Sequence, residues 1–389
     1  MNMMLLSIIP FLLCAEDEII PLAPFFKDPT MDIPTIKLPS GKYAGNTISV
    51  KEHDRRVESL SSDQTVTLID DNQNEPLVFV LNATFGMKAV SIVPSRRYFI
   101  HAKADSLVIL DEFRESLVGQ FYTPGEVTTR HFIFTNTNVQ NVCMEREYSL
   151  LVTNYPIDSV KIENCSFTDV SHVLPSWTLH QGEYADRVEI KNTSFVNCTA
   201  PVSGGIVFGV FAKYLSLDQV SMNRCTASRS DAFQITSAKP TVRISHSNFT
   251  NCYTESTLLD GGVMLFTKPV SLTISKSIFA NNTCEGNGGV FAFAGGVSSL
   301  EIENCQFLTN SAARGGSLFF GRRASTAPVL FKFDHLAFHN KAQIGSDIAA
   351  KAWPVGLSAV DFRNCSSRSA KPRIFDEEHR KVYDWTDTN

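Results

Sequence analysis

The sequence predicts an all-β fold, a right-handed parallel β-helix with three strands in each coil and about nine recognisable coils. One unit recurs every 27 to 31 residues, and it begins with two apolar residues two positions apart, which is the periodicity of a strand. Every copy has a polar residue at the same later position, and four copies also carry a glycine pair. A fixed period of this length in a β-rich sequence is typical of stacked solenoid coils.

The first strand of each unit is followed, five positions after its second apolar residue, by Phe or Met. The complete copies are Val160, Ile162 and Phe167; Val188, Ile190 and Phe195; Leu215, Leu217 and Met222; Val242, Ile244 and Phe249; Leu272, Ile274 and Phe279; Leu300, Ile302 and Phe307; and Phe331, Phe333 and Phe338. Val360 with Phe362 opens an incomplete copy, and Phe132, Phe134 and Val139 form a degenerate earlier one. Stacked coils about 4.8 Å apart would align these residues in buried columns.

A corner is predicted between the first and second strands, because the Phe lies out of phase with the residues before it. The corner column reads Asn136, Asn164, Asn192, Gln219, His246, Lys276, Asn304, His335 and Asn364. Asn tolerates left-handed backbone better than other residues with a side chain, which suits a tight corner. The third strand is expected after the glycine pairs, which are Gly204-Gly205, Gly261-Gly262, Gly288-Gly289 and Gly315-Gly316.

The chain divides into four predicted segments. Residues 1–15 are apolar and precede three acidic residues, as in a secretory signal peptide. Residues 16–130 are a lead-in or cap with irregular first coils, 131–366 hold the repeats, and 367–389 form a C-terminal tail or cap. After the first 15 residues no stretch reaches membrane-spanning length. An extracellular protein, secreted or peripherally attached to the cell surface, is therefore expected.

Secretion makes glycosylation sites and cysteines informative. The Asn-x-Ser/Thr sites are Asn82, Asn164, Asn192, Asn197, Asn248, Asn281 and Asn364. Nine cysteines become eight after loss of the signal peptide, which permits full pairing. Consecutive positions in the stack favour Cys198 with Cys225 and Cys252 with Cys284, while buried, reduced cysteines remain the alternative.

The outward positions of the first strands carry charge. Opposite charges are expected on neighbouring strands, such as Lys161 beside Glu189 and Glu163 beside Lys191, which indicates a solvated face that controls register. Glu301 and Glu303 are the best candidates for a catalytic carboxylate pair, with an expected separation of about 6.6 to 6.8 Å along one strand. No Cys or His spacing indicates a metal site, and no motif indicates a cofactor. The net charge of -5 does not favour nucleic-acid binding.

The repeats resemble those of chlamydial polymorphic membrane proteins and of related secreted β-helix proteins of trichomonads. The resemblance covers about residues 130 to 365 and rests on glycine pairs and on the FxxN signature at Phe279–Asn282 and Phe307–Asn310. Phe195–Asn197, Phe249–Asn251 and Phe338–Asn340 are one residue shorter, and Ala never follows a glycine pair. The resemblance implies a pectate-lyase-like solenoid and extracellular display.

The sequence thus favours a protein that acts in binding or adhesion, with a host-surface protein or glycan as partner. A carbohydrate-active enzyme and a structural coat component are the alternatives. Clustered carboxylates facing a groove would favour the enzyme, whereas an exposed aromatic or hydroxyl ladder on one flat face would favour binding.

Overall fold

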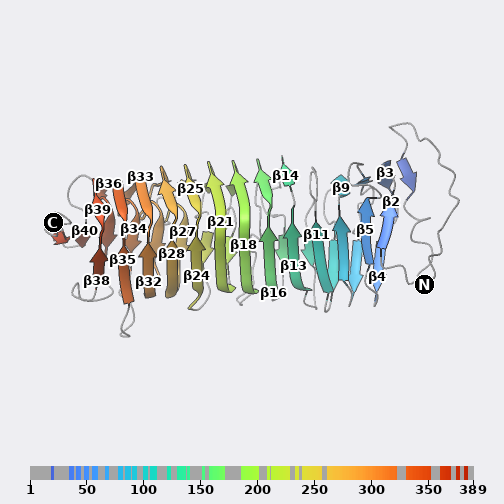
Figure 1. Cartoon of the computed structure of the whole chain (residues 1–389), viewed down its shortest axis with the longest axis horizontal. Coiled ribbons are helices and arrows are strands. Elements are labelled where there is room, and N and C mark those ends of the chain that lie inside the picture. Colours follow the sequence, from blue (N-terminus) through green and yellow to red (C-terminus); the bar gives the residue numbers. More distant parts are fainter. Residues whose placement is uncertain are drawn as a thin grey trace.

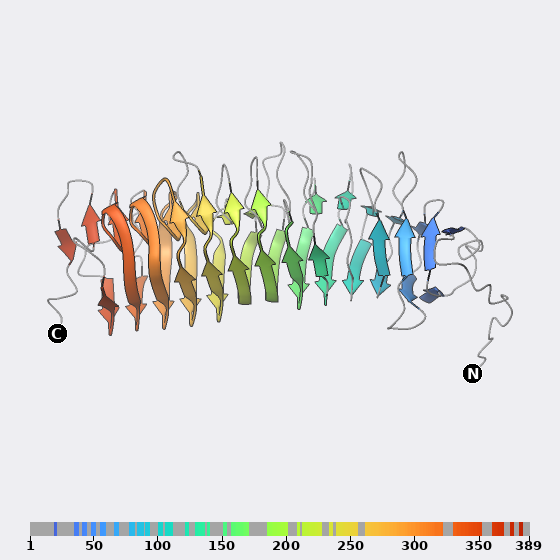
Figure 2. The same ribbon diagram turned by 90° about the horizontal axis from the view of Figure 1, so that it is seen from above.

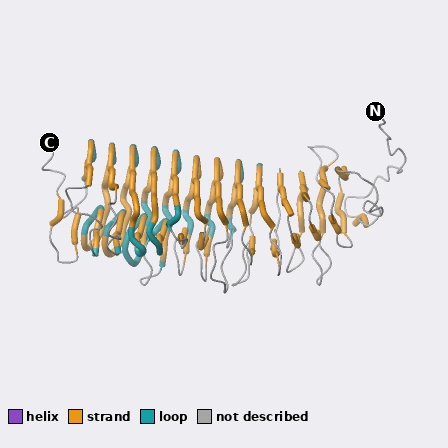
Figure 3. The backbone as a smooth tube through the Cα atoms, turned by 90° about the horizontal axis from the view of Figure 1, so that it is seen from below, coloured by secondary structure: helices purple, strands orange, loops and turns teal. Residues whose placement is uncertain are grey.

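Figure 1 shows the computed structural model of the chain, a rod of stacked β-strands that runs from β2 at one end to β38 at the other. The structure describes residues 19–21, 35–38, 41–44, 48–51, 55–59, 66–69, 78–81, 84–88, 90–93, 100–103, 106–111, 121–123, 129–136, 138–140, 151–153, 157–170, 185–200, 208–210, 212–227, 233–235, 239–255, 261–321, 330–351, 360–368, 374–376 and 381–383. Within these residues there is no helix, as Figure 3 also shows. The predicted signal peptide, residues 1–15, lies outside them.

The first sheet is the longest one and contains the first strand of every repeat. Its strands, in spatial order, are β2 (Thr35–Leu38), β5 (Arg55–Ser59), β8 (Thr84–Lys88), β11 (Ser106–Asp111), β13 (Thr129–Thr135), β16 (Ile157–Glu163), β18 (Ala185–Val196), β21 (Ala212–Asn223), β24 (Thr241–Ser245), β28 (Val270–Ser275), β32 (Val297–Glu303), β35 (Leu330–Asp334) and β38 (Val360–Arg363). All of these pairings are parallel, so the predicted fold class is confirmed.

The second sheet begins after the corner and holds the Phe or Met of each repeat. It contains β14 (Asn138–Gln140), β17 (Ser166–Thr168), the second halves of β18 and β21, β25 (Asn248–Thr250), β29 (Ile278–Ala280), β33 (Gln306–Arg314), β36 (Ala337–Ile344) and β39 (Ser366–Ser367). After a further corner follow the short strands β19 (Thr199–Ala200), β22 (Thr226–Ala227), β26 (Tyr253–Thr254) and β30 (Thr283–Cys284).

The third sheet closes each coil, and Figure 2 shows its short strands beside the longer ones. It contains β20 (Phe208–Val210), β23 (Phe233–Ile235), β27 (Met264–Phe266), β31 (Phe291–Phe293), β34 (Leu318–Phe320), β37 (Ile348–Ala350), β40 (Ile374–Asp376) and β41 (Lys381–Tyr383). β41 pairs antiparallel with β40, so the tail adds an antiparallel strand to the end of this sheet.

No membrane-spanning helix is found in the part of the chain that the structure describes.

The remaining strands lie in the N-terminal part of the chain. They are β1 (Ile19–Pro21), β3 (Gly41–Ala44), β6 (Val66–Ile69) and β9 (Val90–Val93) in one parallel sheet; β4 (Ile48–Lys51), β7 (Val78–Leu81) and β10 (Ile100–Lys103) in another; and the pair β12 (Phe121–Thr123) and β15 (Leu151–Thr153). Because β2, β5, β8 and β11 already belong to the first sheet, the predicted number of nine coils does not match the structure.

The core consists of the predicted columns. In the first sheet, Val160 lies beside Val188 and Ile162 beside Ile190, and all four side chains are buried. In the second sheet, Phe rings of successive coils stack with centroids 5.0 to 5.2 Å apart, from Phe249 through Phe338. Stacked rings add about 0.5 to 1.5 kcal/mol per pair to the effect of burial, so the columns join neighbouring coils.

The predicted corner is confirmed by the backbone. All nine residues of the corner column have a positive φ, between 44° and 55°. A second left-handed corner follows five residues later, at Asp169, Asn197, Arg224, Asn251, Asn281 and Thr309. This second column was not predicted from the sequence, although Asp or Asn occupies most of its positions.

The glycine pairs have a steric cause. The first glycine of the pair has a positive φ, as Gly288 shows at 73°. The second glycine lies against the next coil, because a Cβ on Gly289 would be 2.1 Å from the carbonyl oxygen of Gly316. Only glycine permits this approach of two coils at the start of the third sheet.

One interior column changes its chemistry along the rod. It contains Cys198, Cys225 and Cys252 in successive coils and then Asn282, Asn310 and Asn340. All six side chains are buried. Asn282 Nδ2 donates to Asn310 Oδ1 at 3.0 Å, Asn310 Nδ2 to Asn340 Oδ1 at 2.9 Å, and Asn340 Nδ2 to Asp347 Oδ1 at 2.9 Å.

The predicted disulfides do not occur, because none of the seven described cysteines forms a disulfide with another described cysteine. Cys198 and Cys225 are neighbours, as expected, but remain reduced. Cys284 lies beside Thr254, not Cys252, whose backbone N–H reaches Asn282 in the next coil. The pair Cys252 and Cys284 was therefore a wrong prediction, because Cys252 is the first residue after the second corner of its coil and Cys284 is the third, so they lie in different columns.

Candidate binding face on the outer side of the first sheet

The outer face of the first sheet presents three rows of side chains, because every second residue of each strand points away from the core. The first row runs through Ser159, Arg187, Tyr214, Thr241, Ser271 and Ser299. The middle row runs through Lys161, Glu189, Ser216, Arg243, Thr273, Glu301 and Lys332. The third row runs through Glu163, Lys191, Asp218, Ser245, Ser275, Glu303 and Asp334.

Two arginines flank one tyrosine in the centre of this face. The guanidinium carbon of Arg187 lies 4.5 Å from the centroid of the Tyr214 ring, and that of Arg243 lies 5.9 Å from it. The three residues come from β18, β21 and β24, so the cations are two coils apart, on either side of the ring along the rod. We call Arg187, Tyr214 and Arg243 the Arg–Tyr–Arg cluster. Cation–π contacts of about 0.5 to 1 kcal/mol each hold both guanidinium groups near the ring.

The two arginines differ in their partners. Arg187 Nη2 contacts Glu189 Oε1 at 2.5 Å, and this hydrogen bond raises the pKa of Arg187. Arg243 is exposed and has no carboxylate partner within the described part of the chain. Lys213, just before Tyr214, pairs with Asp186 at 2.6 Å. Lys239, just before β24, is exposed.

Small hydroxyl residues cover the face next to the cluster. β24 presents Thr241 and Ser245, and β28 presents Ser271, Thr273 and Ser275. We call these five residues the hydroxyl patch. All five are exposed or partly exposed, and their hydroxyl groups are donors and acceptors on two adjacent strands. The hydroxyl of Ser245 already donates to Asp218 Oδ1 at 2.7 Å.

The expected charge pairing is correct in register but not in its ion pairs. Lys161 is the register partner of Glu189, and Glu163 that of Lys191. However, Lys161 Nζ contacts Glu163 Oε2 at 2.6 Å, two residues along the same strand, and this contact lowers the pKa of Glu163. Long side chains on one face of a strand reach this distance, so the cross-strand contacts expected here are replaced by contacts within β16 and β18.

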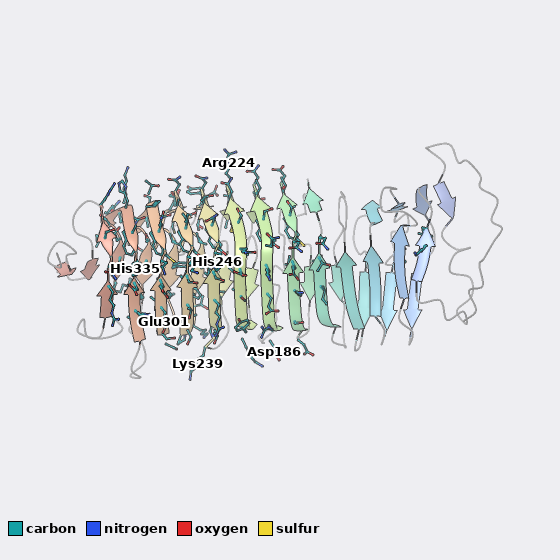
Figure 4. All side chains as sticks on the ribbon, in the orientation of Figure 1. Asp186, Arg224, Lys239, His246, Glu301 and His335 are labelled. Atoms are coloured by element: carbon teal, nitrogen blue, oxygen red, sulfur yellow. The ribbon has the colours of Figure 1, made fainter. Side chains whose placement is uncertain are left out.

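Glu301 and Glu303 lie on β32 and are the register partners of Thr273 and Ser275 of the hydroxyl patch. Glu301 is labelled in Figure 4. Glu301 is partly exposed beside Lys332. Glu303 is exposed and accepts a hydrogen bond from Asn304 Nδ2 at 3.1 Å. The described parts of the chain contain no cluster of three or more His, Cys, Asp or Glu side chains that could bind a metal ion.

A second polar row lies on the short strands after the second corner. Thr199, Thr226, Tyr253, Thr283 and Ser311 are register partners in consecutive coils. The Tyr253 hydroxyl donates to Glu285 Oε1 at 2.6 Å, and this bond raises the pKa of Tyr253 to about 12. The row provides hydroxyl groups but no cation cluster among its own members.

The glycosylation candidates lie on the surface wherever the structure describes them. The exposed ones are Asn164, Asn192, Asn197, Asn248, Asn281 and Asn364. Asn82 lies outside the described residues. Asn164 and Asn192 are engaged at the first corner, where Asn192 Nδ2 donates to Asn164 Oδ1 at 2.8 Å. Whether any site carries a glycan stays a prediction.

No family model, no curated protein and no solved structure matches the chain in a comparison with known proteins. The fold is a parallel β-solenoid, and the site must be interpreted from its own residues.

Neither the Arg–Tyr–Arg cluster nor the hydroxyl patch was predicted from the sequence. A signal for the patch was present, because Thr241–Ser245 and Ser271–Ser275 alternate apolar residues with Ser, Thr or Arg. No such signal existed for the cluster: Arg187 and Arg243 stand 56 positions apart in the sequence, and only the register brings both to Tyr214.

Proposed function

We propose that this protein is a secreted or surface-displayed β-solenoid whose work is binding or adhesion, as in the polymorphic-membrane-protein-like repeats that it resembles. The partner is a glycan or a protein on another surface. The hydroxyl patch beside the Arg–Tyr–Arg cluster is the observation that carries the proposal. An exposed array of hydrogen-bond donors, acceptors and an aromatic residue can recognise a polar ligand without catalysing a reaction on it.

Several further observations support extracellular display. The apolar segment 1–15 precedes acidic residues as a signal peptide does, and six exposed asparagines occupy glycosylation motifs. A rod with one continuous outer sheet would also present the same face over its whole length.

A carbohydrate-active enzyme is the competing proposal. Its best residues remain Glu301 and Glu303, which share one outer strand face beside the hydroxyl patch. Two carboxylates two residues apart on a strand are separated by about 6.6 to 6.8 Å, a spacing seen in inverting glycosidases. A structural coat component is the third class, which would need no ligand.

The test is gel filtration of the purified mature protein with fluorescent polysaccharides, acidic and neutral, and with a panel of extracellular-matrix proteins. Earlier elution of a partner would support binding. A progressive shift of a polysaccharide to later elution would show cleavage and would overturn the proposal in favour of an enzyme; Glu301→Gln with Glu303→Gln should then abolish that shift. Unchanged elution of every partner would overturn binding and favour the coat.

A further inference from the structure

We infer that the Arg–Tyr–Arg cluster and the hydroxyl patch together form a binding site for a linear acidic polysaccharide that lies along the rod axis. The inference rests on the proposed binding function and names its ligand class. The acid groups of the polymer contact Arg187 and Arg243, and its sugar hydroxyls contact the hydroxyl patch.

Tyr214 acts as the positioning residue of this site. Its ring lies between the two guanidinium groups, at 4.5 Å from Arg187 and 5.9 Å from Arg243. An exposed arginine normally loses side-chain entropy when it binds an anion, and a ring that already holds the guanidinium reduces this loss. The planar group keeps its N–H donors at its edges, where a carboxylate or a sulfate can accept them.

The charges around the cluster favour an anion although the chain as a whole is acidic. Glu189 engages one nitrogen of Arg187, and Asp186 engages Lys213. Arg243 and Lys239 are left as exposed cations without a carboxylate partner among the described residues. Figure 4 shows Lys239 and Asp186 projecting from the same edge of the first sheet.

The direction of the ligand follows from the register. Arg187, Tyr214 and Thr241 are register partners in three consecutive strands, and Arg243 follows Thr241 by two residues. The two cations are therefore separated by about twice the strand spacing, about 10 Å along the rod. This distance is close to the length of two sugar rings, so acid groups on a linear polymer can reach both. The hydroxyl patch continues the same path across β24 and β28.

Glu301 limits the site on its far side. It is the register partner of Thr273, so the strand next to the patch, β32, presents a carboxylate. Within the site, Glu189 contacts Arg187, and Asp218 accepts a hydrogen bond from Ser245 Oγ. Glu301 and the exposed Glu303 on β32 would repel an acidic polymer, so the site is confined to β18, β21, β24 and β28. A neutral polymer would meet no such limit.

The test is the affinity of the full mature chain for three labelled oligosaccharides of matched length: oligogalacturonate with carboxylates, dextran sulfate with sulfates, and neutral dextran. Arg187→Gln with Arg243→Gln removes both cations. The matched control is Lys332→Gln with Arg363→Gln, which removes the same charge from the same face outside the site. Circular dichroism checks that each variant keeps its fold, and Tyr214→Phe and Tyr214→Leu separate the ring from the hydroxyl.

The expected result is that an acidic oligosaccharide binds the wild type, more weakly at high salt, and that the cluster variant loses about tenfold in affinity. The control should stay within about twofold. Tyr214→Phe should bind as the wild type does, because it keeps the cation–π contacts, whereas Tyr214→Leu should weaken binding. The stronger of the two acidic probes identifies carboxylate or sulfate as the recognised group.

Other outcomes separate this inference from the proposed function. Equal losses in the cluster variant and in the control would overturn the site but leave binding intact. Binding of dextran or of a protein, without binding of either acidic probe, would likewise overturn only the ligand class. Failure to bind any partner would overturn both the ligand class and the proposed function.

Discussion

The two halves of the repeat region differ in where asparagine side chains form hydrogen-bonded ladders between coils. The ladder lies on the outer surface in the first half and in the core in the second. In the half before Cys252, the first corner carries exposed asparagines, and Asn164 Nδ2 donates to Asn136 Oδ1 at 3.2 Å while Asn192 Nδ2 donates to Asn164 Oδ1 at 2.8 Å. This outer ladder ends at Asn192, because the next two residues of the corner column are Gln219 and His246. After Cys252 the ladder is inside, through Asn282, Asn310 and Asn340.

The replacement of cysteine by asparagine in the interior column changes how that position contacts the neighbouring coils. The Phe carbonyls of preceding coils are contacted by thiols in the first half, with Cys198 Sγ 3.5 Å from Phe167 O. In the second half they accept from amides, with Asn310 Nδ2 2.9 Å from Phe279 O. A thiol is a weak donor, whereas each asparagine also accepts the backbone N–H of the preceding coil. The same position is therefore mainly a packing site in one half and a hydrogen-bonding site in the other.

The largest effect is expected at Phe249, where the two halves meet. Its buried ring stacks on Phe279 at 5.2 Å, and its carbonyl accepts from Asn282 Nδ2 at 2.9 Å. Phe249→Asp places an unpaired carboxylate in the core and should lower the free energy of unfolding by more than about 5 kcal/mol. Urea unfolding should then show two transitions, one for each half.

Phe249→Leu is the control, with an expected loss of about 1.5 kcal/mol in the free energy of unfolding. A single cooperative transition in Phe249→Asp would contradict the division of the rod into two halves.

The next effect compares the two chemistries of the inner column. Asn310→Leu removes the acceptor of the Asn282 backbone N–H and the amide donor to the Phe279 carbonyl. It also removes one of the two acceptors of Asn282 Nδ2, which keeps Phe249 O, and the total cost should be about 3 to 5 kcal/mol. Cys225→Ala removes one buried sulfur and should cost about 1 to 2 kcal/mol. Urea unfolding measures both, and Asn248→Thr on the exposed face should change little. Equal losses for Asn310→Leu and Cys225→Ala would show that the ladder adds nothing beyond packing.

The sequence predicted the architecture because its spacing determines the register. The apolar pairs and the Phe column repeat with steps near 28 residues, so alignment of the repeats already places Val160 beside Val188. The earlier coils could not be aligned in the same way because their steps vary: Thr35 pairs with Arg56, Arg56 with Gly86, and Gly86 with Ile109. Steps of unequal length leave no period to detect.

The roles of adjacent asparagines could not be separated by sequence. Asn281 has a positive φ at the second corner, whereas Asn282 is fully buried in the ladder. Both belong to the same FxxN-like segment, and residue type alone does not say where the chain turns. The same unseen corner led to the wrong pairing of Cys252 with Cys284. The binding face was missed for another reason, because its arginines meet only through three strands.

The alkaline stability should distinguish the cysteine half from the asparagine half. The hydrogen bond with Cys225 and burial raise the pKa of Cys198. The pKa of Cys225 is also raised, because the lowering effect of Cys198 is outweighed by the contact with Cys252 and by burial. Above about pH 9 the unfolded chain loses these protons while the folded chain keeps them, so the free energy of unfolding falls as pH rises. The fall is at most about 1.4 kcal/mol per pH unit for each thiol.

Urea unfolding between pH 8 and pH 10 measures this slope. Cys198→Ala with Cys225→Ala should make it shallower, whereas Asn310→Leu should keep the wild-type slope because it removes no titrating group. Cys305, whose pKa burial raises to about 12, should sustain part of the slope in every variant. An unchanged slope in the double cysteine variant would show that other groups dominate the alkaline range.

The smallest effect concerns the outer corner of the asparagine half. Lys276 is exposed there with a φ of 49°, a conformation that costs most residues about 1 to 2 kcal/mol and asparagine less. Lys276→Asn should therefore raise the free energy of unfolding by up to about 1 kcal/mol, as measured by urea unfolding. The reverse change at Asn304, which has a φ of 54°, should lower it by a similar amount. If both changes were neutral, backbone strain would not distinguish the corners, and the outer amide ladder of the first half would owe its stability to its side-chain hydrogen bonds.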